Sequence, residues 1–192
     1  MPGWGIALII VAAVVVLLIA LLMGTYNSLV KLNERVNEAW SDITIQLKRR
    51  ADLVPNLVEV VKGYAKHETE AIKAVSDARA KMMGARTVES SAEADKSLTG
   101  ALSRLMAVTE SYPELKANTN FQQLTSELSD TEDKIQAARR FYNAGAKELN
   151  TKIKLFPTNL INNLIGHFKT REYYDVADDE KARIDQAPEV KF

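Results

Sequence analysis

The chain has 192 residues, with 25 basic and 25 acidic side chains that give a formal net charge of zero, and it contains no cysteine. A balanced charge supplies no global field that would attract nucleic acid, and the lack of cysteine excludes disulfides and thiol chemistry. Because aromatic residues make up only 7% and glycines and prolines are few, the composition favours helices.

The first predicted element is an apolar run from Ile6 to Met23, which follows Trp4 and contains no charged side chain. As a helix this run spans about 27 Å, close to the roughly 30 Å hydrocarbon core of a bilayer. It therefore predicts a transmembrane helix at 6–23 with a short external tail at 1–5. A removable signal peptide is the weaker interpretation, because the start lacks a basic side chain and residues 21–25 form a poor cleavage site.

The basic residues near the span predict its orientation. Lys31 and Arg35 follow the span and none precedes it, which favours an external N-terminus and a cytoplasmic C-terminal domain. We therefore expect a single-pass protein of the bacterial cytoplasmic (inner) membrane. Two cations are few, so a domain on the external or periplasmic side stays open as the alternative.

The span is expected to continue as one rod into the soluble part. Apolar residues recur in steps of three and four from Tyr26 to Leu47, which places them on one helix face. Pro55 lacks an amide donor and clashes with the preceding turn, so the helix should kink or end near 52–54, at a kink or tight corner. A second helix, from Leu57 to Met82, has a heptad-like seam interrupted at Glu68.

Two further helices follow. The third contains a seam from Leu98 to Val108, is capped by Ser90 or Ser91, and stops at Tyr112-Pro113. After a loop at 111–120, in which Asn118, Thr119 or Asn120 can cap the next helix, the last long helix runs from Phe121 to Phe156, about 35 residues and roughly 50 Å. Its seam is empty only at Gly145, where a side chain would fit better.

The chain changes character after Phe156-Pro157. Residues 159–168 predict a short amphipathic helix with Leu160, Leu164 and Phe168 facing inward. The charged run 178–183 is most simply solvated. The alternating ending 188–192 suits an extended docking strand.

These elements predict an all-α fold. A single N-terminal transmembrane helix continues into an elongated antiparallel bundle of three or four long helices, with a short C-terminal helix and an extended tail. The expected organisation is an external tail at 1–5, a transmembrane helix at 6–23, a helical bundle at 24–156, and a short helix and tail at 157–192.

Residues that could carry chemistry form no recognisable site. His67-Glu68 lacks the second histidine of a zinc helix, because position 71 is Ala71. Glu34, Glu38 and Asp42 lie on one helix face, where a cation site is the minor interpretation and solvated carboxylates the major one. Residues 48–50 are densely basic; we expect Arg49 or Arg50 to pair with Asp52 or with acids such as Glu132 and Asp133 on the long helix, not with lipid.

Long, ordered strings across nearly the whole chain resemble the LemA family: Tyr26–Val30, Ala39–Ile43, Gln46–Arg50, Asp52–Val58, Val61–Ala65, Ala101–Leu105, Tyr112–Asn118, Ala138–Asn143 and Pro188–Phe192. The resemblance implies an N-terminal anchor with a short external tail and an α-helical C-terminal domain. It implies no established molecular activity and no catalytic residue.

The sequence therefore favours surfaces over a reactive pocket. We expect a membrane-anchored, non-enzymatic helical scaffold that self-associates or docks partner proteins. Its expected partners are the lipid bilayer through residues 6–23, a second copy of the chain and unidentified proteins, but not nucleic acid. No catalytic, cofactor-binding or metal-binding residue is predicted, and no cofactor. The alternative is a peptide or small-ligand receptor that uses a groove between helices.

Overall fold

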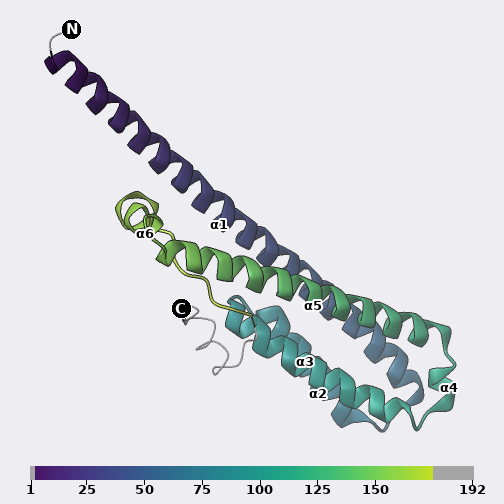
Figure 1. The fold of residues 1–192 in the computed structure, drawn as a ribbon. Helices are drawn as coiled ribbons and strands as arrows, with labels where there is room; N and C mark the ends of the chain where they lie inside the picture. Colours follow the sequence, from purple (N-terminus) through teal and green to yellow (C-terminus); the bar gives the residue numbers. More distant parts are fainter. Residues whose placement is uncertain (1–2, 175–192) are drawn as a thin grey trace, which may run out of the picture. The chain divides into compact units, whose positions relative to one another are not determined.

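The computed structural model describes residues 3–174 of the chain (Figure 1). Every regular element in this part is helical: α1 (Gly3–Tyr64), α2 (Thr69–Gly84), α3 (Val88–Thr109), α4 (Pro113–Lys116), α5 (Thr119–Lys154), α6 (Thr158–Ile161) and the π-helical turn η1 (Asn162–Gly166). The predicted all-α fold, with a long apolar N-terminal helix and a multi-helix bundle, is confirmed. The predicted charged run 178–183 and docking strand 188–192 lie outside the described residues.

The chain forms two compact units. Unit 1 comprises residues 1–38 and 144–171, and unit 2 comprises residues 39–143 and 172–192. The helices α1 and α5 each contribute one part to unit 1 and the other part to unit 2. Each unit is therefore built on helix segments that are distant in sequence.

The core of unit 2 is made by apolar side chains that recur every three or four residues on four helices. Burying a side chain of this size contributes about 1.5–3 kcal/mol, so these faces hold the helices together. The buried residues include Ile43, Leu47, Val54, Leu57 and Val61 of α1, Val75 and Met82 of α2, Leu98, Leu102 and Leu105 of α3, and Phe121, Leu128 and Ile135 of α5.

Of the two predicted alternatives near 52–54, a kink or an end of the first helix, the end is excluded, because α1 continues through Pro55 to Tyr64. Proline cannot donate to the carbonyl four residues earlier, which here belongs to the fully buried Ala51. Arg79 of α2 replaces the missing donor, since its Nε donates to the Ala51 oxygen at 2.9 Å. A side chain from another helix therefore allows α1 to pass the proline.

The predicted helix from Leu57 to Met82 is instead divided at residues 65–68, between α1 and α2. Side chains from the link around α4 hold this break. The Tyr112 hydroxyl donates to Glu68 Oε1 at 3.0 Å, and Asn118 Nδ2 donates to the Tyr64 hydroxyl at 3.0 Å. The break therefore rests on contacts that a single helical pattern does not contain.

The helix caps are partly as predicted. Thr87, not Ser90 or Ser91, caps α3: its Oγ1 accepts from the Ser90 amide at 3.1 Å, and Ser90 Oγ accepts from the Thr87 amide at 3.0 Å. Of the three predicted candidates for the cap of α5, Asn118 is the one that caps it, because its Oδ1 accepts from the Phe121 amide at 3.1 Å. The short helix α4 in the intervening loop was not predicted.

In unit 1, α1 packs antiparallel to the end of α5. Arg35 pairs with Glu148 at 3.4 Å, and about two turns nearer the N-terminus of α1 the Lys152 ammonium donates to the Ser28 hydroxyl. The buried side chains between them are Leu29, Leu32 and Val36 of α1 and Ala146 and Leu149 of α5.

Gly145 of α5 faces Val36 of α1. The expectation that a side chain would fit better there is wrong, because a Cβ at Gly145 would lie 3.3 Å from Val36 Cγ2. The empty position in the seam is therefore filled by the Val36 side chain.

The inward face predicted for residues 159–168 is also wrong. Leu160 is 52% exposed and Leu164 is 74% exposed, whereas Thr158, Ile161 and Asn162 are buried. The prediction assumed that the apolar side chains determine which face of the segment is buried. Here the hydrogen bonds between the Asn162 side chain and the Phe168 backbone hold the opposite face inward. Only Phe168 of the predicted inward set is partly buried, with its ring centroid 6.0 Å from that of Tyr26.

Candidate functional site

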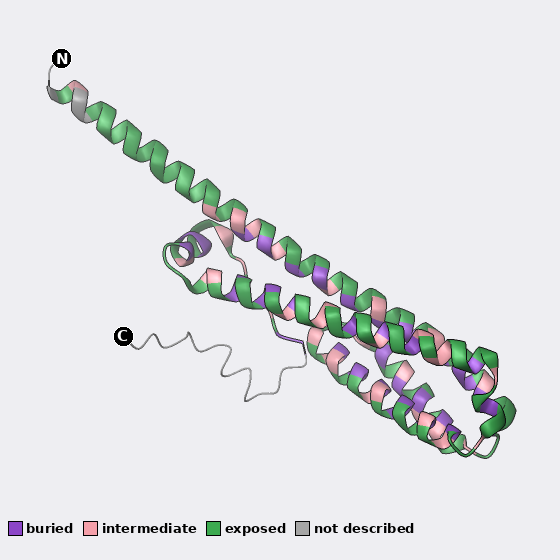
Figure 2. Ribbon diagram, turned by 45° about the vertical axis from the view of Figure 1, so that its right-hand side comes forward, coloured by how far each residue is buried: buried purple, intermediate pink, exposed green. Residues whose placement is uncertain are grey.

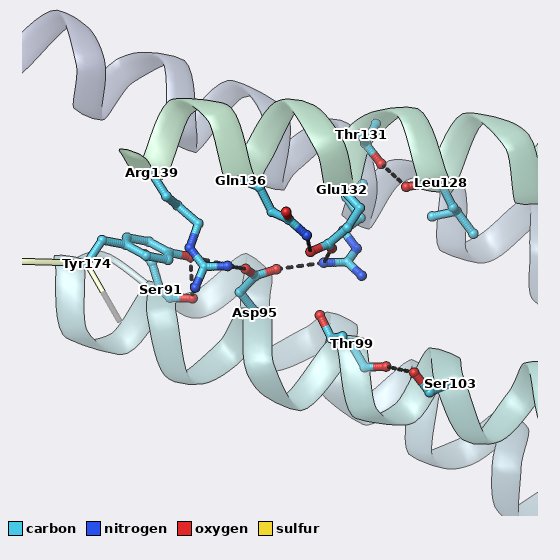
Figure 3. A network of polar contacts seen from close by, with 11 residues as sticks. Ser91, Asp95, Thr99, Ser103, Leu128, Thr131, Glu132, Gln136, Arg139 and Tyr174 are labelled. Atoms are coloured by element: carbon cyan, nitrogen blue, oxygen red, sulfur yellow. Dashed lines mark hydrogen bonds and ion pairs between the residues drawn. The ribbon is translucent and has the colours of Figure 1, made fainter. Parts of the chain in front are cut away.

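The most concentrated polar chemistry in the described part of the chain is a buried ionic cluster in unit 2 (Figure 3). Arg50 of α1 is 4% exposed, and its Nη1 lies 2.8 Å from Asp95 Oδ1 and 2.6 Å from Glu132 Oε2. Asp95 comes from α3 and Glu132 from α5, so one guanidinium joins three helices. Arg139 of α5 adds a second cation 3.7 Å from Asp95 Oδ2.

Burial dominates the electrostatics of this cluster. Loss of water around Asp95 raises the pKa of its carboxyl above the ordinary value of 3.8, although Arg50 and Arg139 act in the opposite direction. Glu132 adds a smaller effect in the same direction as burial. The two cations therefore offset only part of the cost of burying the carboxylate.

A tyrosine from the segment after η1 completes the cluster. The Tyr174 hydroxyl lies 3.3 Å from the Ser91 carbonyl oxygen and 3.4 Å from Asp95 Oδ2, and the Arg139 guanidinium stacks 4.8 Å from the tyrosine ring centroid. Asn143 bonds the Tyr174 backbone twice, accepting from its amide at 2.8 Å and donating to its carbonyl at 3.0 Å. The segment at 172–174 is thereby fastened to α5 and α3.

The cluster is suited to holding helices in register and not to catalysis. Arg50, Asp95 and Tyr174 are nearly inaccessible to solvent, and their charged or hydroxyl groups face one another. A substrate would have to break these contacts before it could reach a polar atom. We therefore assign the cluster a structural role.

A cleft on unit 2 is a candidate ligand site, and it shares Ser91 with the ionic cluster. It has a volume of about 340 Å³ and is mainly apolar, with the cations of Lys48 and Arg86 among its lining residues. Such a lining suits a ligand with an apolar body and an anionic group. The lining residues are Trp40, Thr44, Ile45, Leu47, Lys48, Met82, Met83, Ala85, Arg86 and Ser91.

The N-terminal part of α1 is exposed and apolar, and it forms neither a polar cluster nor a cleft (Figure 2). From Leu8 to Met23 every side chain is exposed, although almost all are large and apolar. This helix is long and apolar enough to cross a membrane, and its apolar window buries nothing within the chain. An apolar surface of this size is the usual mark of a membrane or protein contact.

The residues considered from sequence are dispersed or internally paired. Of the basic run, Lys48 and Arg49 are exposed, and the predicted pairing with Glu132 is made by Arg50. Glu34 accepts from the side-chain amides of Asn33 and Asn37 at 3.2 and 3.3 Å. Among the described residues, no group of three or more His, Asp or Glu side chains is placed to hold a metal ion.

Sequence reasoning missed Asp95, Arg139 and Tyr174. Asp95 carried a usable signal, since it stands three residues before Leu98 and seven before Leu102, in step with the buried seam of α3. An acidic residue at a seam position predicts a buried partner of opposite charge. Tyr174 carried no such signal, because it follows the last helix.

Comparison with known proteins agrees with this architecture. A model of the LemA family matches residues 39–192. Magnetosome protein MamQ 1 of Paramagnetospirillum magneticum is 29% identical over 83% of this chain and 68% of its own length. MamQ of Magnetospirillum gryphiswaldense is 28% identical over 81% and 66%, and protein LemA of Metamycoplasma hominis is 31% identical over 72% and 64%.

These names denote no enzyme class, and the apolar helix fits a membrane location. Because the family match covers most of the sequence and includes the whole described part of unit 2, the chain belongs to the LemA family.

Proposed function

We propose that the protein is a non-enzymatic helical scaffold, anchored in the bacterial cytoplasmic membrane, that self-associates or docks partner proteins there. The observation that carries this proposal is α1 itself. Its residues 8–23 expose a continuous apolar surface, and the same helix continues without a break into the buried core at Leu29 and beyond. The exposed apolar surface and the buried side chains of unit 1 therefore lie on one continuous helix.

The organisation expected from sequence enters the proposal unchanged. Residues 6–23 span the bilayer, 1–5 lie outside, 24–156 form the bundle, and 157–192 form a short helix and tail in the cytoplasm. The alternative places the body on the external or periplasmic side. Support for a surface function comes from unit 2, where the apolar seams are buried and the Arg50 guanidinium is paired with Asp95 and Glu132.

Two measurements test anchoring and orientation, and the absence of cysteine makes single-cysteine labelling clean. The full chain should stay in the membrane pellet after alkaline extraction. A cysteine at Asp77, which is exposed on α2, should react with an impermeant maleimide only after the cells are opened. Labelling in intact cells would reverse the orientation, and release into the soluble fraction would refute the anchor.

Self-association and partner docking are separated by crosslinking. Crosslinking in the native membrane, followed by identification of the products, should give either multiples of the chain or adducts with other proteins. The molar mass of the protein in detergent then checks the first result. A monomeric mass at micromolar concentration, together with no crosslinked product in the membrane, would refute the scaffold.

The cleft on unit 2 favours a receptor as the second candidate function. Its apolar lining with Lys48 and Arg86 suits a peptide that has apolar side chains and a terminal carboxylate, and in the segment 188–192 the apolar Pro188, Val190 and Phe192 alternate with Glu189 and Lys191. Trp40 lines the cleft and can report occupancy by fluorescence. A synthetic peptide of residues 188–192 should shift its emission and the amidated peptide should not; no shift with either would reject this ligand.

A further inference from the structure

The membrane-side end of unit 1 carries a second apolar surface besides the N-terminal helix. We name residues 155–165 the apolar cap, after their exposed large side chains: Leu155, Phe156, Leu160, Leu164 and Ile165. Phe156 and Leu164 are 77% and 74% exposed. Elsewhere after Tyr26, the described chain exposes large apolar side chains only singly, at Ile45, Tyr64, Met83 and Phe141.

The apolar cap exposes more large apolar side chains than a water-soluble helix would. Thr158 and Asn162 are buried together with Ile161, while its leucines face outward and Asn163 is exposed. Asn162 fixes this arrangement, because its side chain donates to the Phe168 carbonyl at 3.1 Å and accepts from the Phe168 amide at 2.9 Å, and its carbonyl accepts from the His167 amide at 2.7 Å. The leucines are therefore held outward by a bonded turn and are not exposed by fraying.

Contacts within unit 1 place the apolar cap beside the end of the apolar surface of α1. Lys152 donates to Ser28, and the rings of Phe168 and Tyr26 lie 6.0 Å apart. The helices are antiparallel, so the step from Lys152 to Leu155 and the step from Ser28 to Met23 point in the same direction. From the helical rise, Leu155 lies about 5 Å beyond Lys152, and Met23 lies about 7.5 Å beyond Ser28. The apolar cap is thus at the level where a bilayer around residues 6–23 would begin.

The charged side chains in this region are basic, although the net charge of the whole chain is zero. Residues 149–171 contain no acidic side chain, and their basic residues are Lys152, Lys154, Lys169 and Arg171. Lys154 and Lys169 are exposed, whereas Lys152 and Arg171 are partly buried and bond to side chains of α1. Residues 1–33 likewise contain no acid and one base, Lys31. A basic surface beside apolar side chains is the composition that binds an anionic lipid surface.

We propose that the apolar cap inserts into the interfacial layer of the bilayer that α1 crosses, with the neighbouring cations on the phosphates of anionic phospholipid. This inference rests on the proposed anchoring by residues 6–23. A single helix leaves the attached body free to rotate about the membrane normal and to tilt, and a second contact beside it removes the tilt. Unit 1 then meets the membrane through two surfaces, the span and the apolar cap.

The test uses the full chain in vesicles of phosphatidylcholine and phosphatidylglycerol, with one cysteine labelled by an environment-sensitive fluorophore. Leu164→Cys reports the apolar cap, Val14→Cys reports the span, and Asp77→Cys on α2 is the aqueous control. Nitroxide on the lipid acyl chain near the headgroup should quench the label at 164, and iodide should quench it several-fold less than the label at 77. Vesicles of phosphatidylcholine alone should weaken the lipid quenching at 164 and leave that at 14 unchanged.

Each outcome decides between explanations. Lipid quenching at 14 with iodide quenching at 164 equal to that at 77 overturns the apolar cap and leaves the anchor intact. Iodide quenching at 14 overturns the anchor itself. A label at 164 that neither reagent quenches, together with disulfide crosslinking of unlabelled Leu164→Cys between copies, assigns the surface to a second copy of the chain and overturns the lipid contact. Leu160→Ser in the Leu164→Cys chain changes an already exposed residue and should reduce the lipid quenching at 164.

Discussion

The contact between Arg79 and the Ala51 carbonyl gives the sharpest test of how α1 passes Pro55. Ala51 is fully buried, and its carbonyl has lost the helical donor that any residue other than proline at position 55 would supply. Arg79→Met keeps the length of the side chain but removes the Nε donor. Pro55→Ala restores the backbone donor. The two single variants and the double variant form a double-mutant cycle. In this cycle, the effect of Arg79→Met on the free energy of unfolding should depend on the residue at position 55.

The expected magnitudes follow from the geometry of the bond. A buried carbonyl without a donor costs about 1–3 kcal/mol, so Arg79→Met should lower the free energy of unfolding by about 2 kcal/mol. Pro55→Ala should raise it by up to about 3 kcal/mol, the cost of proline inside a helix. When alanine occupies position 55, its amide serves the Ala51 carbonyl, and loss of Arg79 should cost less than about 0.5 kcal/mol. The coupling energy is therefore about 1.5 kcal/mol.

The assay is urea unfolding of the full chain in a mild detergent, followed by far-UV circular dichroism. Arg104→Met, at an exposed position of α3, is the matched control and should change stability by less than about 0.5 kcal/mol. Additive effects of Arg79→Met and Pro55→Ala, within about 0.5 kcal/mol, would show that Arg79 does not replace the missing donor. An effect of Arg79→Met no larger than that of the control would refute the reasoning outright.

Three further outcomes follow from the buried groups. In the same urea assay, Arg50→Met should cost about 3–5 kcal/mol by leaving the buried Asp95 carboxylate without its nearest cation, whereas Arg49→Met at the exposed neighbour should cost under about 0.5 kcal/mol. Equal costs would contradict the ionic cluster. Because burial raises the pKa of Asp95 above 3.8, the folded chain binds the Asp95 proton more tightly than the unfolded chain does. The contribution of this proton to the free energy of unfolding is complete below pH 3.8 and is lost as pH rises through the raised pKa. Unfolding free energies measured across this range should therefore fall relative to those of Asp95→Asn as pH rises, and a constant difference would argue against the shift. Gly145→Val should lower the stability of the fold by about 1–3 kcal/mol, because the new side chain crowds Val36, whereas Gly100→Ala in open space should raise it by about 0.5–1 kcal/mol. Calorimetric melting measures both changes, and stabilisation by both variants would contradict the crowding at Gly145.

Features decided by neighbouring residues were predictable from the sequence. The long helix and its Asn118 cap follow from local spacing and from one side chain three residues before the amide it accepts from. The apolar N-terminal helix follows from composition alone. The pairing of Arg50 with Glu132 is one of the alternatives that the sequence predicts, which join Arg49 or Arg50 to Asp52 or to acids of the long helix such as Glu132 and Asp133.

Features decided by distant residues were not predictable. Proline normally ends a helix, and the donor that prevents this at position 55 comes from Arg79, 24 positions later in the chain and 28 after Ala51. The exposed face at 160–165 has the same origin. A pattern of leucines predicts burial, whereas the bonds of Asn162 to Phe168 determine which face turns outward.

The ionic cluster shows why a chain of this kind places charges in a core that apolar residues could fill. Seams of leucine, valine and alanine tolerate a shift of one helix along another by a whole heptad, because the same kinds of side chain meet again. A shift would separate Arg50 from Asp95 and Glu132 and bury charges without partners, which costs several kcal/mol. The cluster therefore adds little net stability but excludes the shifted arrangements of α1, α3 and α5. For a protein proposed to act through the position of its surfaces above a membrane, a fixed helix register is the property that function needs, and a purely apolar core would not provide it.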